Sequence, residues 1–246
     1  MDHMRIALIS DVHANLVALE AILDDLDSLD GILQIVCLGY IAASGPQPRE
    51  VVERFRSLDC KMIMGNMDEW LLEPESYQGK DEFYRIVTDI NFWCAAQLHD
   101  EDFPYLGAFQ QNAEIPLGNS NKLLCYHGSP RSNTDFFTSS TPDEDLDVYL
   151  SGHQALVMAG GHSHVQMLRR YRGSLLINPG SVGLAFERTQ SSERNVPWAE
   201  YAVLGWDGNR VAVEFRRVPY DMGKLKNAAF NSGMPHVEWF VKKWQV

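Results

Sequence analysis

The sequence predicts an α/β fold, and three observations lead to this expectation. The chain has 246 residues, of which 45% are hydrophobic, enough to bury one large core. In its first third, short apolar runs alternate with segments of helical periodicity. Further along, short apolar runs follow one another with few residues between them, which is typical of neighbouring strands. We therefore expect helices packed on a sheet, followed by a strand-rich part of the same domain.

Strand and helix alternate at the start of the chain. The run "RIALIS" at 5–10 predicts a buried strand, and Asn15 is expected to cap a helix with an apolar face of Leu16, Leu19, Ile22, Leu23 and Leu26. A second strand is expected over 33–38, and the next helix begins at about Pro48, a residue suited to a first helical turn. The third strand, 60–64, runs into Gly65 and a further helix.

The middle of the chain predicts one long helix over 81–98, rich in large apolar side chains, which we interpret as a core or lid helix. After it, "KLLCYHG", "ALVMAGG", "VQMLRRY" and "LLINPG" predict short strands. Asp207 and Gly208 separate two alternating runs, so a hairpin with a tight turn is expected there. The segment 222–246 predicts one or two helices.

We expect one domain, 4–246, because no linker or repeat divides the chain. Within it, 81–112 is interpreted as a helical insertion or lid and 221–246 as a C-terminal helical appendage. The opening "MDHM" resembles a cloning remnant, so residues 1–3 are set apart.

Composition argues against several classes of protein. The net charge of -12 without a basic block disfavours a general nucleic-acid binder. No apolar run is long enough for a membrane span or a signal peptide, so a cytoplasmic protein is expected. The four cysteines form no CxxC pair and are expected to be free thiols rather than disulfides or zinc ligands.

Polar side chains follow the predicted strands, where each strand ends. They are Asp11, His13, Tyr40, Asn66, Asp68, His127, His162 and His164. Each short motif has an ordinary structural explanation, since Asp and His often cap helices or occupy turns. Their joint placement at strand ends is what favours a metal site. Imidazole, carboxylate and amide ligands together suit Zn, Mn, Fe or Ni better than Ca or Mg.

The series "DVH", "CLGY", "GNMD", "YHGSP", "GHSH" and "NPGSVG" resembles the calcineurin-like metallophosphoesterases, in particular their small bacterial phosphodiesterase-like branch, over 4–220. The resemblance implies a four-layer α-β-β-α sandwich of two mixed sheets, with two metal ions, bridged by a water or hydroxide, at the strand ends. It implies a first ligand group, Asp11, His13 and His164, and a second ligand group, Asn66, His127 and His162. Catalysis would rest on Asp11, Asn66, His127, His162 and His164. Asn66 would also bind substrate, and Arg131, just past "HGSP", could meet a substrate phosphate or remain a solvated loop residue.

Two positions depart from the family pattern. Where the family has an aspartate bridging both metals this chain has Tyr40, and where a histidine is common it has Met67. Three alternatives are open for Tyr40: it is a further metal ligand, most plausibly of ferric iron, it turns away into the core, or it blocks the pocket. Because two dications close together repel, loss of the bridging carboxylate should weaken at least the second metal site.

The leading hypothesis is a metal-dependent phosphoesterase that hydrolyses a phosphodiester or a small phosphorylated metabolite with a metal-activated hydroxide. The expected cofactors are divalent ions of Mn, Fe, Zn or Ni. The family pattern implies two ions per protein, and the presence of Tyr40 could reduce this number to one. The alternative is a weakened or inactive module of the same fold that binds metal or phosphate. A nuclease is disfavoured by the scarcity of basic residues near the motifs. Substrate identity and oligomeric state are left open.

Overall fold

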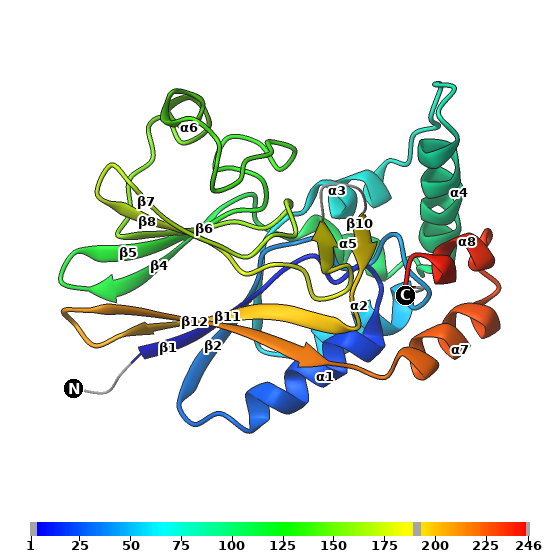
Figure 1. Ribbon diagram of the computed structural model, residues 1–246, viewed down its shortest axis with the longest axis horizontal. Helices are drawn as coiled ribbons and strands as arrows, with labels where there is room; N and C mark the ends of the chain where they lie inside the picture. The colour runs from blue at the N-terminus through cyan, green and yellow to red at the C-terminus, as the bar shows by residue number, and fades with distance from the viewer. Residues whose placement is uncertain (1–3, 189–192, 245–246) are drawn as a thin grey trace.

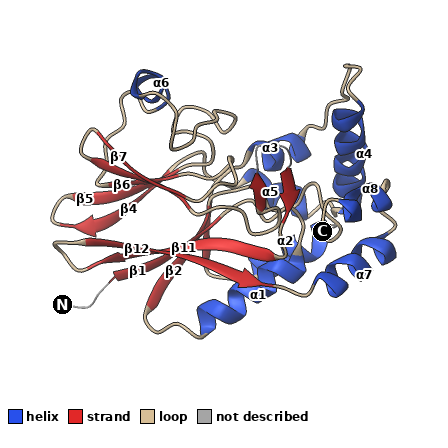
Figure 2. Ribbon diagram, in the orientation of Figure 1, coloured by secondary structure: helices blue, strands red, loops and turns tan. Residues whose placement is uncertain are grey.

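The structure is a computed structural model that describes residues 4–188 and 193–244, so the supposed cloning remnant lies outside the described residues. Two five-stranded sheets pack face to face, with helices against their outer faces (Figure 1; Figure 2). The predicted α/β class and its layered arrangement are confirmed.

The first sheet has the strand order β12-β11-β1-β2-β3. Strands β1, β2 and β3 run parallel, whereas β11 is antiparallel to both of its neighbours. The bounds are β1 (Met4–Ile9), β2 (Ile32–Cys37), β3 (Cys60–Met62), β11 (Trp198–Trp206) and β12 (Val211–Pro219).

The second sheet has the order β4-β5-β6-β8-β7, with β5, β6 and β8 parallel and the outer strands antiparallel. A separate two-stranded ribbon pairs β9 with β10. The bounds are β4 (Ala113–Gly118), β5 (Asn121–Cys125), β6 (Val157–Ala159), β7 (Met167–Tyr171), β8 (Ser174–Asn178), β9 (Phe186–Arg188) and β10 (Glu193–Asn195).

The helices lie outside the two sheets (Figure 2). They are α1 (Leu16–Asp27), α2 (Pro48–Arg56), α3 (Asn66–Leu72), α4 (Glu82–Gln97), α5 (Asp102–Gly107), α6 (Asp143–Tyr149), α7 (Met222–Ser232) and α8 (Val237–Lys242). Helices α4, α7 and α8 gather at one end of the sandwich, where the described chain also ends (Figure 1).

Three apolar clusters hold the layers together. The cluster between the sheets includes Leu8 of β1 and Leu123 of β5, both fully buried. The largest cluster joins the outer face of the first sheet to its helices, for example through Leu19 and Ile90. The third packs Leu146 of α6 against the outer face of the second sheet. Because burial of apolar area is the main favourable term in folding, these clusters fix how the strand ends meet.

Local signals explain several element boundaries. The side chain of Asn15 accepts a hydrogen bond from the backbone of Ala18 at 3.0 Å, as a helix N-cap does. Pro48 stands in the first turn of α2. The predicted hairpin is β11 and β12, whose register pairs Trp206 with Val211 around the predicted turn.

Some elements were not anticipated from the sequence. Strand β4 has a clear alternation of buried and exposed residues, but Pro116 within it argues against a strand by sequence rules. Helix α6 begins with a strongly acidic turn and buries only Leu146, so its apolar face is too short to recognise. Segment 81–112 contains α4 and α5 as two helices. The interpretation of 81–112 as an insertion or lid stays a prediction. The same holds for the interpretation of 221–246 as an appendage, and residues 245–246 lie outside the described part.

The hydropathy of the helices and the state of the cysteines can also be read from the structure. No helix among the described residues combines the length and hydropathy needed to span a membrane. The four cysteines are free thiols, three of them buried, as predicted.

Candidate metal centre

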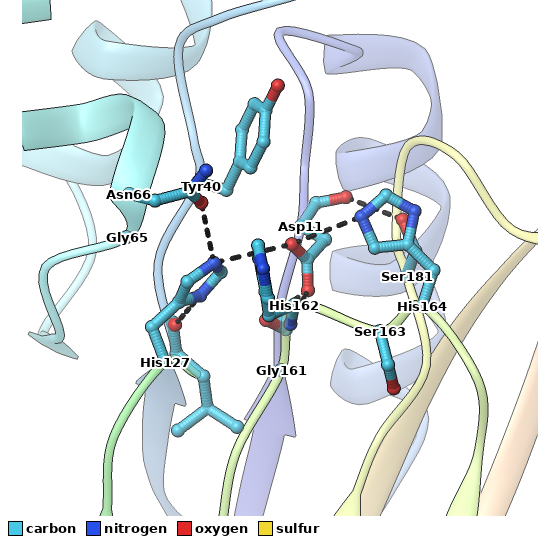
Figure 3. A network of polar contacts seen from close by, with 12 residues as sticks. Asp11, Tyr40, Gly65, Asn66, His127, Gly161, His162, Ser163, His164 and Ser181 are labelled. Carbon is cyan, nitrogen blue, oxygen red and sulfur yellow. Dashed lines mark hydrogen bonds and ion pairs between the residues drawn. The ribbon is translucent and has the colours of Figure 1, made fainter. Parts of the chain in front are cut away.

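The loops after β1, β2, β5 and β6 meet at one edge of the sandwich (Figure 3). The carboxyl ends of parallel strands point to the same edge of a sheet, and here the two sheets present that edge side by side. The backbone of Asp11 donates to the carbonyl of Gly39 at 2.9 Å, which joins the loops after β1 and β2. In the second sheet the backbone of Gly161 donates to the carbonyl of His127 at 2.8 Å. The predicted site residues are thereby brought together.

Gly161 allows the two sheets to approach at this edge. A Cβ atom at Gly161 would lie 1.9 Å from Ser10 Oγ and 2.7 Å from Asp11 Oδ2, distances that no side chain can occupy. The next residue, His162, donates its backbone N–H to Asp11 Oδ2 at 2.9 Å. Ser10 donates to the same oxygen at 2.6 Å. One carboxylate oxygen of Asp11 is thus held firmly, which leaves Oδ1 to face the site.

The first ligand group is compact. The ligand atoms of Asp11, His13 and His164 all lie within 4.8 Å of one another. The Nε2 atoms of the two histidines are 3.0 Å apart, and His164 Nε2 is 3.3 Å from Asp11 Oδ1. Figure 3 shows Asp11 between His164 and His127. Three donor atoms therefore converge on one point.

Electrostatics at Asp11 favour the carboxylate form. Burial alone would raise its pKa, but the charges of His164 and His127 outweigh burial and hold the pKa of this carboxyl well below its ordinary value. Asp11 Oδ1 is buried and lacks a hydrogen bond of good geometry among the described residues, and its contact there is the ion pair with His164 Nε2 at 3.3 Å. A buried carboxylate oxygen so placed would be stabilised further by a bound cation.

Backbone carbonyls orient two of the histidines. His127 Nδ1 lies 2.6 Å from the carbonyl oxygen of Leu38, and His164 Nδ1 lies 3.2 Å from that of Leu184. Since a carbonyl can only accept, Nδ1 carries a proton in each ring, and Nε2 is the ring nitrogen that faces the site. Histidine ligands of metals commonly have this arrangement.

The second ligand group is assembled around His127. Its Nε2 lies 3.0 Å from Asn66 Oδ1, and its ring centroid lies 5.1 Å from that of His162. The Nε2 atom of His127 and the amide oxygen of Asn66 therefore face each other, and both are atoms that can bind a metal cation.

The hydroxyl of Tyr40 points away from the side chains of Asp11, His127 and His164 (Figure 3). Its hydroxyl lies 2.8 Å from Ser44 Oγ, which in turn donates to Asn91 Oδ1 of α4 at 2.8 Å. Its ring packs on that of His13 with a centroid distance of 3.8 Å. Burial raises the pKa of the Tyr40 phenol, so it keeps its proton. Ligation of a metal by this oxygen would require the side chain to rotate and to lose that proton.

Three other residues singled out in the sequence have structural contacts. Asp68 is fully buried and accepts backbone N–H groups of Tyr40, Ile41 and Gly65 at 2.6–3.0 Å, so it holds the loop after β2 in place. Met67 packs against the helical core. Arg131 is paired with Asp135 through contacts of 2.6 and 3.0 Å.

The backbone is strained at the candidate ligands. Positive φ angles occur at Asp11 (56°), His13 (52°), Tyr40 (63°), His162 (65°) and His164 (56°). This region costs a residue other than glycine about 1–2 kcal/mol. Such strain persists where the surrounding fold enforces it and often marks a functional site. It is evidence for the site that is independent of residue type.

The site fits a transition-metal cation. Burial and the nearby charge of His164 lower the pKa of His13 far below its usual value, and burial and the charge of His127 lower the pKa of His162 to about 4. Both rings are therefore neutral at pH 7, the form that binds metal. His13 Nδ1, like Asp11 Oδ1, is buried without a hydrogen bond in the described part of the chain. Together with the mixed nitrogen and oxygen donors, these atoms suit Mn, Fe, Zn or Ni.

Sequence reasoning missed the partners that direct these side chains. Ser44, which contacts the Tyr40 hydroxyl, and Asn91, which accepts from Ser44, carry no motif, and Asn91 belongs to a helix interpreted only as core or lid. The carbonyl acceptors of Leu38 and Leu184 are backbone atoms, which leave no signal in residue type.

Comparisons with known proteins agree with this geometry. The family model described as the calcineurin-like phosphoesterase superfamily domain matches residues 4–196. An uncharacterised protein from Methanocaldococcus jannaschii is 30% identical, with 95% of this chain and 94% of that protein covered. A metallophosphoesterase from Sphaerobacter thermophilus has a similar structure, with a TM-score of 0.73 at 28% identity over 98% of this chain and 97% of its own. A hypothetical protein from Pyrococcus horikoshii shares the fold, with a TM-score of 0.78 at 19% identity over 97% and 96% of the two chains.

Proposed function

The chain belongs to the calcineurin-like phosphoesterase superfamily, and we propose that it is a metal-dependent phosphoesterase that hydrolyses a phosphodiester or a small phosphorylated metabolite. The observation that carries the proposal is the buried Asp11 Oδ1, which has no hydrogen bond of good geometry in the described part of the chain and lies 3.3 Å from His164 Nε2 and 3.9 Å from His127 Nε2. A carboxylate oxygen among imidazole nitrogens is an arrangement that a cation stabilises.

Each of the two ligand groups would bind one metal ion. The first group, with its carboxylate, would hold one ion, and the second would hold another more weakly. Bound there, divalent ions would lower the pKa of a water molecule and neutralise charge on the phosphoryl oxygens. The backbone carbonyls of Leu38 and Leu184 keep His127 and His164 in the tautomer that presents Nε2.

Asn66 has a second proposed task. Its Oδ1 faces His127, so its Nδ2 points elsewhere and is left to donate a hydrogen bond to a substrate oxygen. A role for Arg131 in substrate binding requires that it leave Asp135, which it contacts with two nitrogens. We therefore place Asn66 before Arg131 as a substrate contact. We also propose a cytoplasmic location for the protein.

Hydrolysis by metal-free and metal-loaded protein tests the proposal. The protein is freed of metal with a chelator, loaded separately with Mn²⁺, Fe²⁺, Zn²⁺ or Ni²⁺, and assayed with bis(p-nitrophenyl) phosphate. We expect hydrolysis to depend on at least one of these metals. Equal hydrolysis by the metal-free protein would contradict a metal-dependent mechanism.

The alternative is a module that binds metal or phosphate but hydrolyses poorly. It is favoured by one observation: Tyr40, at the position where the resemblance implies a bridging aspartate, has its hydroxyl bonded to Ser44. If wild type is inactive with every metal while Tyr40→Asp gains hydrolysis and a second ion, this alternative is correct. Comparable activity of the two proteins supports the enzyme.

A further inference from the structure

A pocket of about 250 Å³ adjoins the candidate metal centre on the side of α4 and α8. Its floor includes His13 and His164, while its walls include Phe83 of α4 and Trp239 of α8. Two of the candidate metal ligands therefore line the same pocket as the aromatic side chains. A substrate bound at the ligand groups must place some of its atoms near this opening.

The wall of the pocket is aromatic. The ring centroids of Phe83 and Trp239 are 5.7 Å apart, and those of Phe83 and Tyr84 are 5.4 Å apart at nearly a right angle. Phe83 and Tyr84 remain 49% and 54% exposed, although both are large apolar side chains on a helix that packs on the body. A ligand that covered these rings would gain free energy from the apolar area it removes from water.

Tyr40 completes the boundary between the pocket and the metal centre. Its ring lines the pocket and packs on His13 at 3.8 Å, while its hydroxyl is fixed by Ser44, which also lines the pocket. At the position where the resemblance implies a bridging aspartate, Tyr40 therefore supplies an apolar wall. An aspartate at position 40 would not supply that surface.

Charge at the rim fits an anion attached to the apolar group. Lys243 lines the same pocket, and its ammonium nitrogen lies 4.0 Å from the Trp239 ring centroid and 5.2 Å from that of Phe83. A positive charge therefore lies beside the aromatic rings of this pocket.

We propose that this pocket binds the organic part of the phosphoester and selects a flat aromatic group there. This inference rests on the proposed phosphoesterase function and names its substrate class as aryl or similarly flat-ringed phosphoesters. Whole small-molecule pockets usually measure about 300–1,000 Å³. A volume of about 250 Å³ next to the metal centre therefore suits one ring system rather than a polymer.

Binding of two phosphonates tests the pocket without requiring turnover. Phenylphosphonate and methylphosphonate carry the same anionic group and differ in the ring. Titration calorimetry on Mn²⁺-loaded protein should show that phenylphosphonate binds about 10- to 100-fold more tightly than methylphosphonate. Equal affinities, or no measurable binding of either compound, would overturn the proposal.

Variants of the pocket residues show which side chains cause the preference for phenylphosphonate. Trp239→Ala and, separately, Phe83→Ala should bring the affinity ratio close to one, and Trp239→Phe should restore most of it. Phe136→Ala is the matched control, because Phe136 lies 6.0 Å from the His162 ring but does not line the pocket. Loss of the preference in Phe136→Ala, with retention in both Trp239→Ala and Phe83→Ala, would place the ring elsewhere and refute the assignment.

The same experiment separates the two proposals. If no metal supports hydrolysis but the phenylphosphonate preference exists and depends on Trp239, the proposed function fails while the ring-binding pocket stands. If hydrolysis occurs and the two phosphonates bind equally, the enzyme stands and the pocket assignment fails.

Discussion

The two ligand groups of the candidate metal centre are built differently. The first group contains a carboxylate, brings its ligand atoms within 4.8 Å of one another, and has positive φ at all three residues. The second group contains no carboxylate of its own, and only His162 among its members has positive φ. The fold therefore imposes more strain to build the first group than the second. This difference predicts one strong and one weak metal site.

Electrostatics give the same ranking. Two unit charges 4 Å apart interact by about 4 kcal/mol at an effective dielectric constant of 20, so two dications repel by roughly 16 kcal/mol. Asp11 offsets only part of this repulsion. A second carboxylate at position 40 would offset more, but Tyr40 is neutral there and directs its hydroxyl to Ser44. We therefore predict that the strength of a second metal site depends on the residue at position 40.

Removal of one histidine from each ligand group should change kcat/KM more than the other substitutions, and the loss should be larger for the first group than for the second. Loss of a residue that merely orients a metal ligand costs about 10- to 100-fold, so loss of a ligand in the stronger group should cost more. We expect His164→Ala to lower kcat/KM for bis(p-nitrophenyl) phosphate by more than about 100-fold, and His162→Ala by less. The exposed His153 provides the control variant His153→Ala. An equal or larger loss in His162→Ala would reverse the ranking of the groups.

Acid should destabilise the metal-free protein through the second group. The pKa of His162 is lowered from 6.5 to about 4 in the folded state. The unfolded chain takes up this proton below pH 6.5, whereas the folded ring stays neutral down to about pH 4. The contribution of neutral His162 to the free energy of unfolding is thus complete above pH 6.5. It is lost as the pH falls from 6.5 through 4, and the loss amounts to about 3 kcal/mol at most.

Urea unfolding of the metal-free protein at pH 7 and at pH 4.5 measures this contribution. His162→Ala should show a smaller loss of unfolding free energy between the two pH values than wild type. The same loss in both proteins would mean that His162 is not held neutral in the folded state.

Gly161→Ala should disturb both groups at once. Its Cβ would lie 1.9 Å from Ser10 Oγ, so the loop carrying His162 and His164 would have to move away from Asp11. We expect a loss of about 1–3 kcal/mol in the free energy of unfolding, together with weaker metal binding. Gly107→Ala is the control, because the nearest atom to its added Cβ is 4.0 Å away. Unchanged metal binding in Gly161→Ala would show that the close approach of the two loops does not matter to the site.

Tyr40→Phe should have the smallest effect. It removes the hydrogen bond to Ser44, which is worth about 1 kcal/mol, and it leaves the ring on His13. Metal content should be unchanged, and iron-loaded wild type should lack a visible phenolate charge-transfer band. A visible band in iron-loaded wild type that disappears in Tyr40→Phe would demonstrate ligation by Tyr40.

Strand ends were predictable because their signals are local. The run at 5–10 and Asn15 contain both the strand pattern and the helix cap, and the structure confirms both. The order of His127, His162 and His164 along the chain predicted that they follow strands, and parallel pairing of β5 with β6 then brings them to one edge. The strand-end pattern thus predicted which side chains gather at this edge, whereas their division into two ligand groups came from the family resemblance.

The direction of Tyr40 could not be predicted, because Asn91, which completes its contact through Ser44, lies 47 residues beyond that serine in sequence. The pocket was also not predictable. It depends on how α4 docks against α8, a tertiary contact between segments more than 130 residues apart, and the interpretation of 81–98 as a core or lid helix gave no hint of an aromatic wall. Arg131 is a third example, since its pairing with Asp135 depends on the conformation of one loop.

Metal stoichiometry of wild type and Tyr40→Asp tests the central claim most directly. Both proteins are stripped of metal and titrated with Mn²⁺ by calorimetry, and the ions are located by anomalous scattering in crystals. Wild type should bind one ion tightly at Asp11, His13 and His164, and a second at least about tenfold more weakly, whereas Tyr40→Asp should bind the second ion more tightly. Two equally tight ions in wild type, or no change in Tyr40→Asp, would contradict the claim that position 40 limits the second site.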